Sequence, residues 1–345
     1  MESKIPIWLD CDPGQDDTVA IILACFHPNF KLIGISTSHG NVSLKNTTSN
    51  ALRVLTALGR TDIPVFPGAS HPIGHSTFAY ASEVHGETGL NGSRLLPQAR
   101  MEAQKGSAFY QHLANIIKEY KGDLSIVATG PLTNMCLFFK NYPELRSQIK
   151  WLPIMGGGFK SFNKNNNAEF NFFCDPLAAN SIMTDKILSN KIILASLDIT
   201  SKVFFPEERQ MQVLGSDSVD TASNFRALMF ELIDSFHKRM VSLRGSDYPG
   251  PKIHDPVALV ALLQFENISQ ELNFSVDRRS FKVGTSKDLS GAIMECTELE
   301  NEGIYVLTDL NVNKFWELVL DVYAIADQKC FINKIPRSLL LENSS

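Results

Sequence analysis

The stretch Asp10-Cys11-Asp12-Pro13-Gly14-Gln15-Asp16-Asp17 places four carboxylates within eight residues and includes no lysine or arginine. Residues 5–9 before it have the apolar pattern of a buried strand, and residues 18–24 after it have that of a buried helix. The acids therefore occupy a strand-to-helix turn. Turns of this kind line the ligand crevice of open α/β sheets, so we expect a binding site here.

This concentration of negative charge indicates a cation. Helix N-termini favour aspartate, which explains one of Asp16 and Asp17 but not two further acids. Strand alternation directs Asp10 and Asp12 to one side and Cys11 to the other. Like charges this close disfavour joint ionisation unless a metal ion or a proton intervenes. An all-oxygen ligand set favours a hard ion, Ca²⁺ or Mg²⁺, over zinc.

Composition narrows the class of protein. The chain has 345 residues, 44% hydrophobic and 20% charged, with a net charge of -5, so it has no excess of basic residues for binding nucleic acid. Residues 1–4 lead directly into the first strand, and no apolar run has the length of a membrane span. We expect a cytoplasmic protein, with the nucleus also compatible. The six cysteines lack metal or redox spacing, and we expect reduced core residues.

The chain alternates between predicted strands and helices. Further strands are predicted at residues 32–37, 124–128 and 192–195, and a long amphipathic helix at 223–243. No linker, composition break or internal repeat divides the sequence. We therefore predict a single α/β domain over residues 1–329, with a mostly parallel central sheet flanked by helices and the site at the C-terminal ends of the strands. Residues 330–345 are expected to form a poorly ordered tail.

Several polar residues follow the predicted strands. Asn41 lies at the turn after the second strand, where a structural and a functional role are both open. Gly130 and Pro131 form a turn that frees backbone carbonyls, which are normal calcium ligands. Glu169 and Asn171 are two residues apart and share one face if that segment is extended, an arrangement that suits sugar hydroxyls.

Two histidines lie in contrasting contexts. His85 is flanked by glycine in a long, weakly periodic segment at residues 67–98, and taken alone it is expected to face solvent. His254 precedes Asp255 and Pro256, which together have the signature of a helix N-terminus with Asp255 as the cap. Capping accounts for Asp255, whereas His254 needs a different explanation.

Taken together, these stretches resemble the nucleoside hydrolase family, calcium-dependent enzymes that hydrolyse the N-glycosidic bond of ribonucleosides. The matching stretches, in the order of the family, are residues 10–17, 40–41, 85–89, 129–134, 155–158, 168–171 and 254–256. They span about Ile5 to Asp327. The resemblance implies a Rossmann-like α/β fold and a homo-oligomer, either a dimer or a tetramer.

The resemblance also implies a role for individual residues. The calcium ligands would be Asp12, Asp17, the Thr129 carbonyl and Asp255. The groups that bind the ribose hydroxyls would be Asp16, Asn41, Asn163, Glu169 and Asn171. His85 and His254 would lie near the base. Asp12 would act as the general base on a water that attacks C1′, and His254 would protonate or solvate the departing base.

One position departs from the family. Its usual tyrosine on the long helix before His254 falls at Met240 here, and a methionine cannot donate a proton. Tyr248 is a candidate substitute. The departure affects assistance to the leaving group.

The positions of the tryptophans bear on the substrate. Purine-specific members of the family stack the base between tryptophans, but Trp8, Trp151 and Trp316 fall in a predicted strand, at a strand entrance and in the predicted closing helix. Base–aromatic stacking contributes ~1–3 kcal/mol per base. We therefore predict that the enzyme prefers uridine as substrate over inosine and adenosine. We also expect the reaction to serve nucleoside salvage. The N-terminal stretch also looks most like fungal uridine nucleosidases.

Three alternatives remain open. A purine-preferring or non-specific nucleoside hydrolase would share the same ribose residues. A haloacid dehalogenase-like phosphatase would use Asp10 as nucleophile with Mg²⁺, but it leaves Asp16, Asp17 and residues 254–256 unexplained. A non-catalytic ribose- or nucleoside-binding protein would use the same polar groups without turnover.

Overall fold

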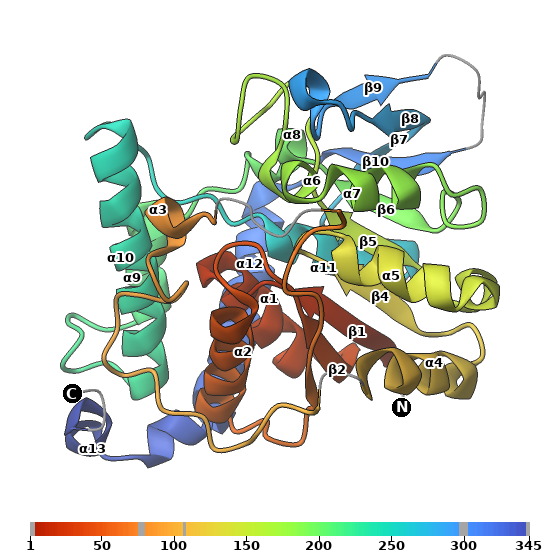
Figure 1. Cartoon of the computed structure of the whole chain (residues 1–345). Helices are drawn as coiled ribbons and strands as arrows, with labels where there is room; N and C mark the ends of the chain where they lie inside the picture. The colour runs from red at the N-terminus through yellow and green to blue at the C-terminus, as the bar shows by residue number, and fades with distance from the viewer. Residues whose placement is uncertain (1–3, 75–79, 106–107, 297–302, 343–345) are drawn as a thin grey trace.

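An eight-stranded sheet runs through the centre of the computed structural model, which describes residues 4–74, 80–105, 108–296 and 303–342 (Figure 1). Its strand order is β3-β2-β1-β4-β5-β6-β10-β7, and every neighbouring pair is parallel except β10 and β7. The strands of the sheet are β1 (Ile5–Cys11), β2 (Phe30–Thr37), β3 (Val65–Pro67), β4 (Ser125–Ala128), β5 (Leu152–Met155), β6 (Ile192–Ala195), β7 (Ser275–Arg279) and β10 (Ile304–Asp309). A separate hairpin pairs β8 (Phe281–Val283) with β9 (Ile293–Glu295). The predicted single α/β domain with a mostly parallel sheet is confirmed.

Helices cover both faces of this sheet (Figure 1). The longer helices are α1 (Gln15–Phe26), α2 (Leu44–Leu58), α4 (Ala108–Tyr120), α5 (Thr133–Asn141), α7 (Pro176–Met183), α9 (Glu207–Leu214), α10 (Asn224–Arg244), α11 (Asp255–Phe265) and α12 (Val312–Lys329). The shorter ones are α3 (Ser82–His85), α6 (Phe170–Cys174), α8 (Leu197–Thr200) and α13 (Arg337–Glu342), with 3₁₀ helices η1 (Pro143–Gln148), η2 (Lys287–Leu289) and η3 (Phe331–Lys334). None of the described helices is long and apolar enough to cross a bilayer.

The strand order reverses beside β1. The chain proceeds outward from β1 to β2 and β3, then returns to place β4 on the other side of β1. At such a switch point the loops leave the sheet in opposite directions and open a crevice at the carboxyl ends of the strands. Asp10 pairs with Ser36 of β2 and Ala128 of β4, so the acidic turn after β1 opens into that crevice.

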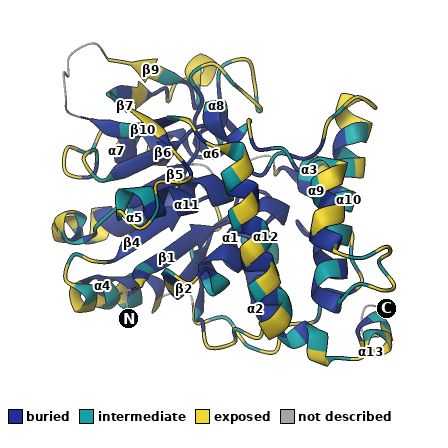
Figure 2. Cartoon of the chain, turned by 180° about the vertical axis from the view of Figure 1, so that it is seen from behind, coloured by how far each residue is buried: buried dark blue, intermediate teal, exposed yellow. Residues whose placement is uncertain are grey.

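The buried core lies on both faces of the sheet, where Figure 2 shows the central strands β1, β4, β5 and β6 mostly in dark blue beneath helices whose outer faces are exposed. Trp8 and Trp316 are fully buried, and the Trp8 indole N–H donates to the Ser36 hydroxyl at 2.9 Å. Four of the cysteines are buried and Cys25 is half-buried, and all six are free thiols. Cys296 is exposed at the end of β9, so the expectation of core cysteines is wrong for that residue.

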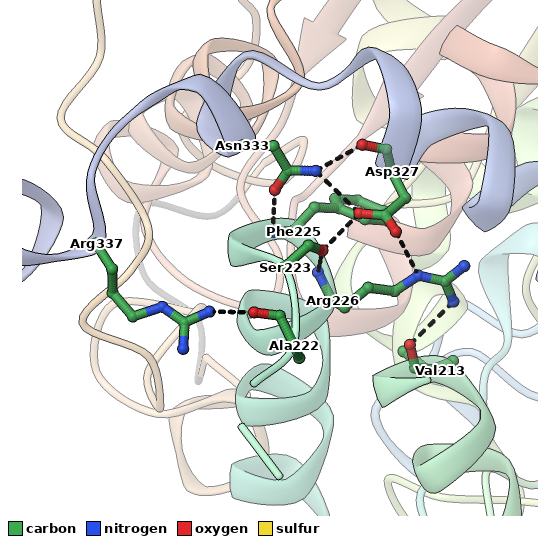
Figure 3. Close-up of polar contacts among 8 residues, drawn as sticks. All are labelled: Val213, Ala222, Ser223, Phe225, Arg226, Asp327, Asn333 and Arg337. Carbon is green, nitrogen blue, oxygen red and sulfur yellow. Dashed lines mark hydrogen bonds and ion pairs between the residues drawn. The ribbon is translucent and has the colours of Figure 1, made fainter. Parts of the chain in front are cut away.

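The C-terminal segment differs from the expected disordered tail. Residues 331–342 form η3 and α13, and Ile332 and Leu340 are buried. Polar contacts join this segment to the start of α10 and the end of α12 (Figure 3). The Asn333 side-chain amide donates to the Asp327 carbonyl at 2.6 Å, and Arg337 donates to the Ala222 carbonyl at 2.7 Å. The Arg337 contact joins positions 115 residues apart in the sequence, which no local pattern predicts.

We predict that Leu340→Ala lowers the free energy of unfolding by about 2 to 3 kcal/mol, because it removes a side chain that is only 6% exposed. The matched variant is Leu339→Ala, whose side chain is 46% exposed and whose loss should cost less than about 0.5 kcal/mol. Urea unfolding of both variants measures the difference. Equal midpoints would mean that α13 contributes no packing energy in solution.

Candidate active site

The acidic turn is shaped by close approach of its backbone to neighbouring loops. The Gly14 N–H donates to a carboxylate oxygen of Asp17 at 2.9 Å, which caps α1 from within its first turn. A Cβ at Gly14 would lie 2.6 Å from Nδ1 of His85, and one at Gly40 would lie 2.0 Å from a carboxylate oxygen of Asp12. Because glycine has no side chain, the segments that carry Gly14, Gly40 and His85 can approach the acids closely.

Asn41 holds Asp12 in place. Its backbone N–H donates to the Asp12 carboxylate at 2.7 Å, and its side-chain amide donates to the Asp12 carbonyl at 3.0 Å. Asn41 is thus a structural residue of the turn, and it also lines the central cavity. Its structural role is confirmed, and its binding role stays a prediction.

Three carboxylates meet closely enough to share a metal ion. One oxygen each from Asp16, Asp17 and Asp255 lie within 4.8 Å of one another, and all three residues are buried. Asp17 also accepts from the Thr129 hydroxyl at 3.0 Å, whereas Oδ1 of Asp16 has no hydrogen-bond partner among the described residues. The resemblance grouped Asp12 with Asp17 and Asp255, whereas the three carboxylates that meet in the structure are those of Asp16, Asp17 and Asp255.

Electrostatics make this cluster costly without a cation. Burial, followed by repulsion from Asp17, raises the pKa of Asp16 to about 7. Burial is also the main cause that raises the pKa of Asp12, Asp17 and Asp255, and repulsion from neighbouring carboxylates adds to the shift in Asp12 and Asp255. A divalent ion would neutralise these charges, and the unpartnered oxygen of Asp16 would serve as one of its ligands. The donor set, entirely oxygen, fits a hard cation.

Asp10 does not line the cavity, although it belongs to the acidic stretch. Its carboxylate accepts from the Ser36 hydroxyl and, at 2.7 Å, from the Asn134 side-chain amide. Burial raises the pKa of Asp10 to about 7. The prediction that Asp10 faces the same site as Asp12 is wrong, because its neighbours on β2 and α5 engage it. A phosphatase would need Asp10 as an accessible nucleophile, so this geometry also contradicts the dehalogenase-like alternative.

A cavity of about 490 Å³ opens above the acids. Every residue assigned to the site from the sequence lines this cavity except Asp17, whose carboxylate lies beside those of Asp16 and Asp255. The lining residues among them are Asp12, Asp16, Asn41, His85, Thr129, Asn163, Glu169, Asn171, His254 and Asp255. Segments distributed over the whole chain therefore converge on one site.

The segment that begins at Glu169 is not extended as far as Asn171, which lies in the first turn of α6. Glu169 caps α6, and its carboxylate accepts from the backbone N–H groups of Gly157 at 2.8 Å and Asn171 at 2.7 Å. The Asn171 amide donates to the Thr129 carbonyl at 2.8 Å, which leaves that carbonyl a second lone pair. Asn163 is exposed and accepts from the Phe170 N–H at 2.9 Å. The cavity wall is thus rigidified by backbone contacts.

His85 is buried rather than exposed to solvent, with 7% of its surface accessible. Its Nδ1 lies 2.8 Å from Oε1 of Gln15, and its ring lies 5.5 Å from that of Phe236. Burial lowers the pKa of His85 to about 4. The default expectation for this histidine failed because α3 packs against α10, a contact without local sequence signal.

His254 occupies the cap position of α11, and Asp255 is the first helical residue rather than the cap. No side chain caps this helix, so the Asp255 carboxylate stays available to the acid cluster. The Thr200 hydroxyl, on α8, lies 2.8 Å from Nδ1 of His254. Burial lowers the pKa of His254 to about 3, so its imidazole is neutral near pH 7.

Sequence reasoning missed Phe236 and Lys252 in the cavity wall. Phe236 lies four residues before Met240 on α10, so the two share a helix face, and both line the cavity. That spacing was readable in the sequence. Tyr248 and Lys252, from the loop after α10, complete this wall. Burial raises the pKa of the Tyr248 phenol, which therefore keeps its proton at neutral pH.

The chain is similar to known proteins over most of its length. Residues 7–317 match the family described as inosine-uridine preferring nucleoside hydrolase. The uridine nucleosidase of Saccharomyces cerevisiae is 37% identical over 94% of this chain and 98% of its own length. The pyrimidine-specific ribonucleoside hydrolase RihA of Photobacterium profundum is 37% identical over 76% of this chain and 80% of its own. The structure of a purine-preferring ribonucleoside hydrolase from Gardnerella vaginalis has the same fold, with a TM-score of 0.82 and 24% identity over 94% of this chain and 99% of that one.

Proposed function

This chain belongs to the family of inosine-uridine preferring nucleoside hydrolases, and we propose that it is a calcium-dependent N-ribosyl hydrolase that prefers uridine. The family membership makes it an enzyme that splits ribonucleosides into ribose and free base. The observation that carries the finer proposal is the buried acid cluster at the floor of the cavity. We also propose that the reaction serves nucleoside salvage, because its products are ribose and a free base. A cytoplasmic location and a homo-oligomeric state stay predictions.

The proposed ligands of Ca²⁺ are Asp12, Asp17, the Thr129 carbonyl and Asp255. When bound, the ion would act as a Lewis acid that lowers the pKa of a water molecule. The acid cluster supports this assignment because burial and mutual repulsion disfavour its ionisation without a cation. Asp16 is proposed to contact the ribose and the same ion, because one of its oxygens lies within 4.8 Å of oxygens of Asp17 and Asp255 and its Oδ1 has no hydrogen-bond partner among the described residues.

Asp12 is the proposed general base. Two contacts from Asn41 fix its orientation, and a base must be held within hydrogen-bond reach of the proton that it takes. After proton transfer the water attacks C1′, and positive charge develops on the ribose ring in an oxocarbenium-like transition state. Carboxylates beneath the ring stabilise that charge. Asn41, Asn163, Glu169 and Asn171 are proposed to bind the ribose hydroxyls, together with Asp16.

His254 is proposed to serve the departing base. As a neutral imidazole it donates a hydrogen bond, or a proton in the transition state, to the leaving nitrogen or oxygen. Tyr248 is a second protonated donor in the cavity wall, where Met240 offers none. This arrangement suits uracil, whose anion is a comparatively good leaving group.

The preference for uridine has two supports. No tryptophan occurs among the described lining residues, although Phe162, Phe170 and Phe236 offer smaller aromatic faces. Among the similar proteins, the yeast enzyme is named a uridine nucleosidase and the bacterial one pyrimidine-specific. A weaker stacking surface penalises the larger purine more than uracil.

We predict that kcat/KM for uridine exceeds that for inosine by roughly one to two orders of magnitude, because about 1–3 kcal/mol of purine stacking is absent. The measurement is release of reducing sugar without added phosphate, with calcium present or removed by a chelator. A ratio at or below one would contradict the stacking argument. No release of ribose from any nucleoside would instead favour a binding protein.

A further inference from the structure

Gln15 lies between Gly14 and Asp16 in the acidic stretch, and its side chain makes two contacts to His85. It is 1% exposed and does not line the cavity. Its Oε1 lies 2.8 Å from Nδ1 of the His85 ring, and its amide nitrogen donates to the His85 carbonyl at 3.5 Å. One side chain therefore engages both the ring and the backbone of a residue 70 positions away.

These two contacts determine where the His85 proton resides. A backbone carbonyl can only accept, so the amide nitrogen of Gln15 faces the His85 carbonyl and Oε1 faces the ring. Because Oε1 can only accept, Nδ1 of His85 must be the donor. In a neutral imidazole one nitrogen carries the proton and the other a lone pair, so Nε2 of His85 is an acceptor.

The acceptor points away from the acids. Nδ1 faces the turn at Gly14 and Gln15, and Nε2 lies on the other side of the ring. His85 packs against Phe236, and Phe236 and Met240 form the apolar part of the cavity wall, opposite in character to the acidic floor. An apolar wall suits the base, whereas the acids suit the ribose. Nε2 is thus available to an N–H group of the base.

We propose that Gln15 is a specificity-determining positioning residue, which holds His85 in the tautomer whose Nε2 accepts the N3–H of uracil. The inference rests on the proposed uridine hydrolysis. Uracil joined to ribose through N1 has a single N–H, at N3. Cytosine carries a lone pair at N3, which would face the lone pair of Nε2. Gln15 therefore makes the site select uridine over cytidine.

The test compares Gln15→Met with Asn50→Leu. Asn50 is a buried amide that also ties the acidic turn to the loop after α3, because it donates to the carbonyls of Pro13 at 3.0 Å and Thr88 at 2.7 Å. It makes no hydrogen bond to His85 in the described structure. Both variants lose a buried amide that joins the acidic turn to the segment around α3. Only Gln15→Met removes the hydrogen bond that fixes the tautomer of His85.

We expect the unmodified enzyme to prefer uridine over cytidine by roughly ten- to a hundredfold in kcat/KM, the effect of one unpaired buried polar group. Gln15→Met should reduce this ratio to within about threefold of unity, mainly through slower uridine hydrolysis. Asn50→Leu should retain the ratio even if loop stability falls. A ratio that Gln15→Met leaves unchanged overturns the proposal.

Nitrogen NMR of histidine-labelled protein supplies a readout that does not depend on turnover. We expect His85, assigned by loss of its signals in His85→Phe, to show a protonated Nδ1 and an unprotonated Nε2, and Gln15→Met to show a mixture. A protonated Nε2 in the unmodified enzyme overturns the inference while uridine hydrolysis stands. If the enzyme hydrolyses neither uridine nor cytidine, that result contradicts both the proposed function and the inference that rests on it.

Discussion

Asp17→Ala is expected to abolish detectable hydrolysis of uridine and to remove calcium binding measured by calorimetry. The variant loses one of three carboxylates whose oxygens lie within 4.8 Å, together with the acceptor of the Thr129 hydroxyl. Asp12→Ala should likewise lower calcium affinity, and it should lower kcat by at least about 10²- to 10⁴-fold because the proposed general base is removed. Unchanged calcium binding in both variants would mean that the ion binds elsewhere.

Two further variants separate the effect of the lost charge on calcium binding from an effect on folding. Asp17→Asn retains an acceptor for the Gly14 N–H that begins α1, so its loss of binding reports the missing charge. Asp10→Asn is the matched control within the same stretch, because Asp10 bonds to Ser36 and Asn134 outside the cavity. We expect Asp10→Asn to retain calcium binding. A loss as large as that of Asp17→Asn would show that all the acids act as one unit.

The pH dependence of stability should also reveal the cluster. The pKa of Asp16 is raised by burial from 3.8 to about 7 in the folded protein, so the folded state binds protons more tightly than the unfolded state. Metal-free enzyme should therefore be most stable below pH 4 as far as this group is concerned, and should lose that stability as the pH rises toward 7. Saturating calcium should flatten this dependence, which thermal unfolding at several pH values measures.

The sequence was sufficient for the parts of the site that lie in short local patterns. The acidic stretch needed a cation on charge grounds, and βα alternation placed it at the carboxyl edge of a parallel sheet. Local pattern did not separate Asp10 from Asp12, since both alternate to the same side of β1. The difference arises from Asn134, 124 residues away, which donates to Asp10.

The missed features share this dependence on distant segments. His85 was expected in solvent because its own loop is polar, yet Gln15 and Phe236 enclose it from α1 and α10. The local pattern alone predicted Asp255 as the cap of α11, but it begins the helix and joins the acid cluster, the place that only the family resemblance implied. Contacts between such segments depend on tertiary packing, which propensity and periodicity do not encode.

His254→Ala is expected to lower kcat for uridine by about 10²- to 10⁴-fold, the usual contribution of a positioned proton donor. The Thr200 hydroxyl supports this role. When the Thr200 hydroxyl donates to Nδ1 of His254, 2.8 Å away, the proton of the neutral ring is on Nε2, the tautomer that the proposed role requires. A neutral ring held this way presents an N–H to the leaving base.

Leaving-group chemistry separates this role from a structural one. Hydrolysis of 4-nitrophenyl β-D-ribofuranoside, whose leaving group needs no protonation, should fall far less in His254→Ala than hydrolysis of uridine. Tyr248→Phe removes a second donor in the wall, and His27→Ala removes a buried histidine at the far end of α1 as a control. If Tyr248→Phe shows the leaving-group-dependent loss and His254→Ala does not, the tyrosine is the donor, and the position vacated at Met240 is filled from the loop after α10.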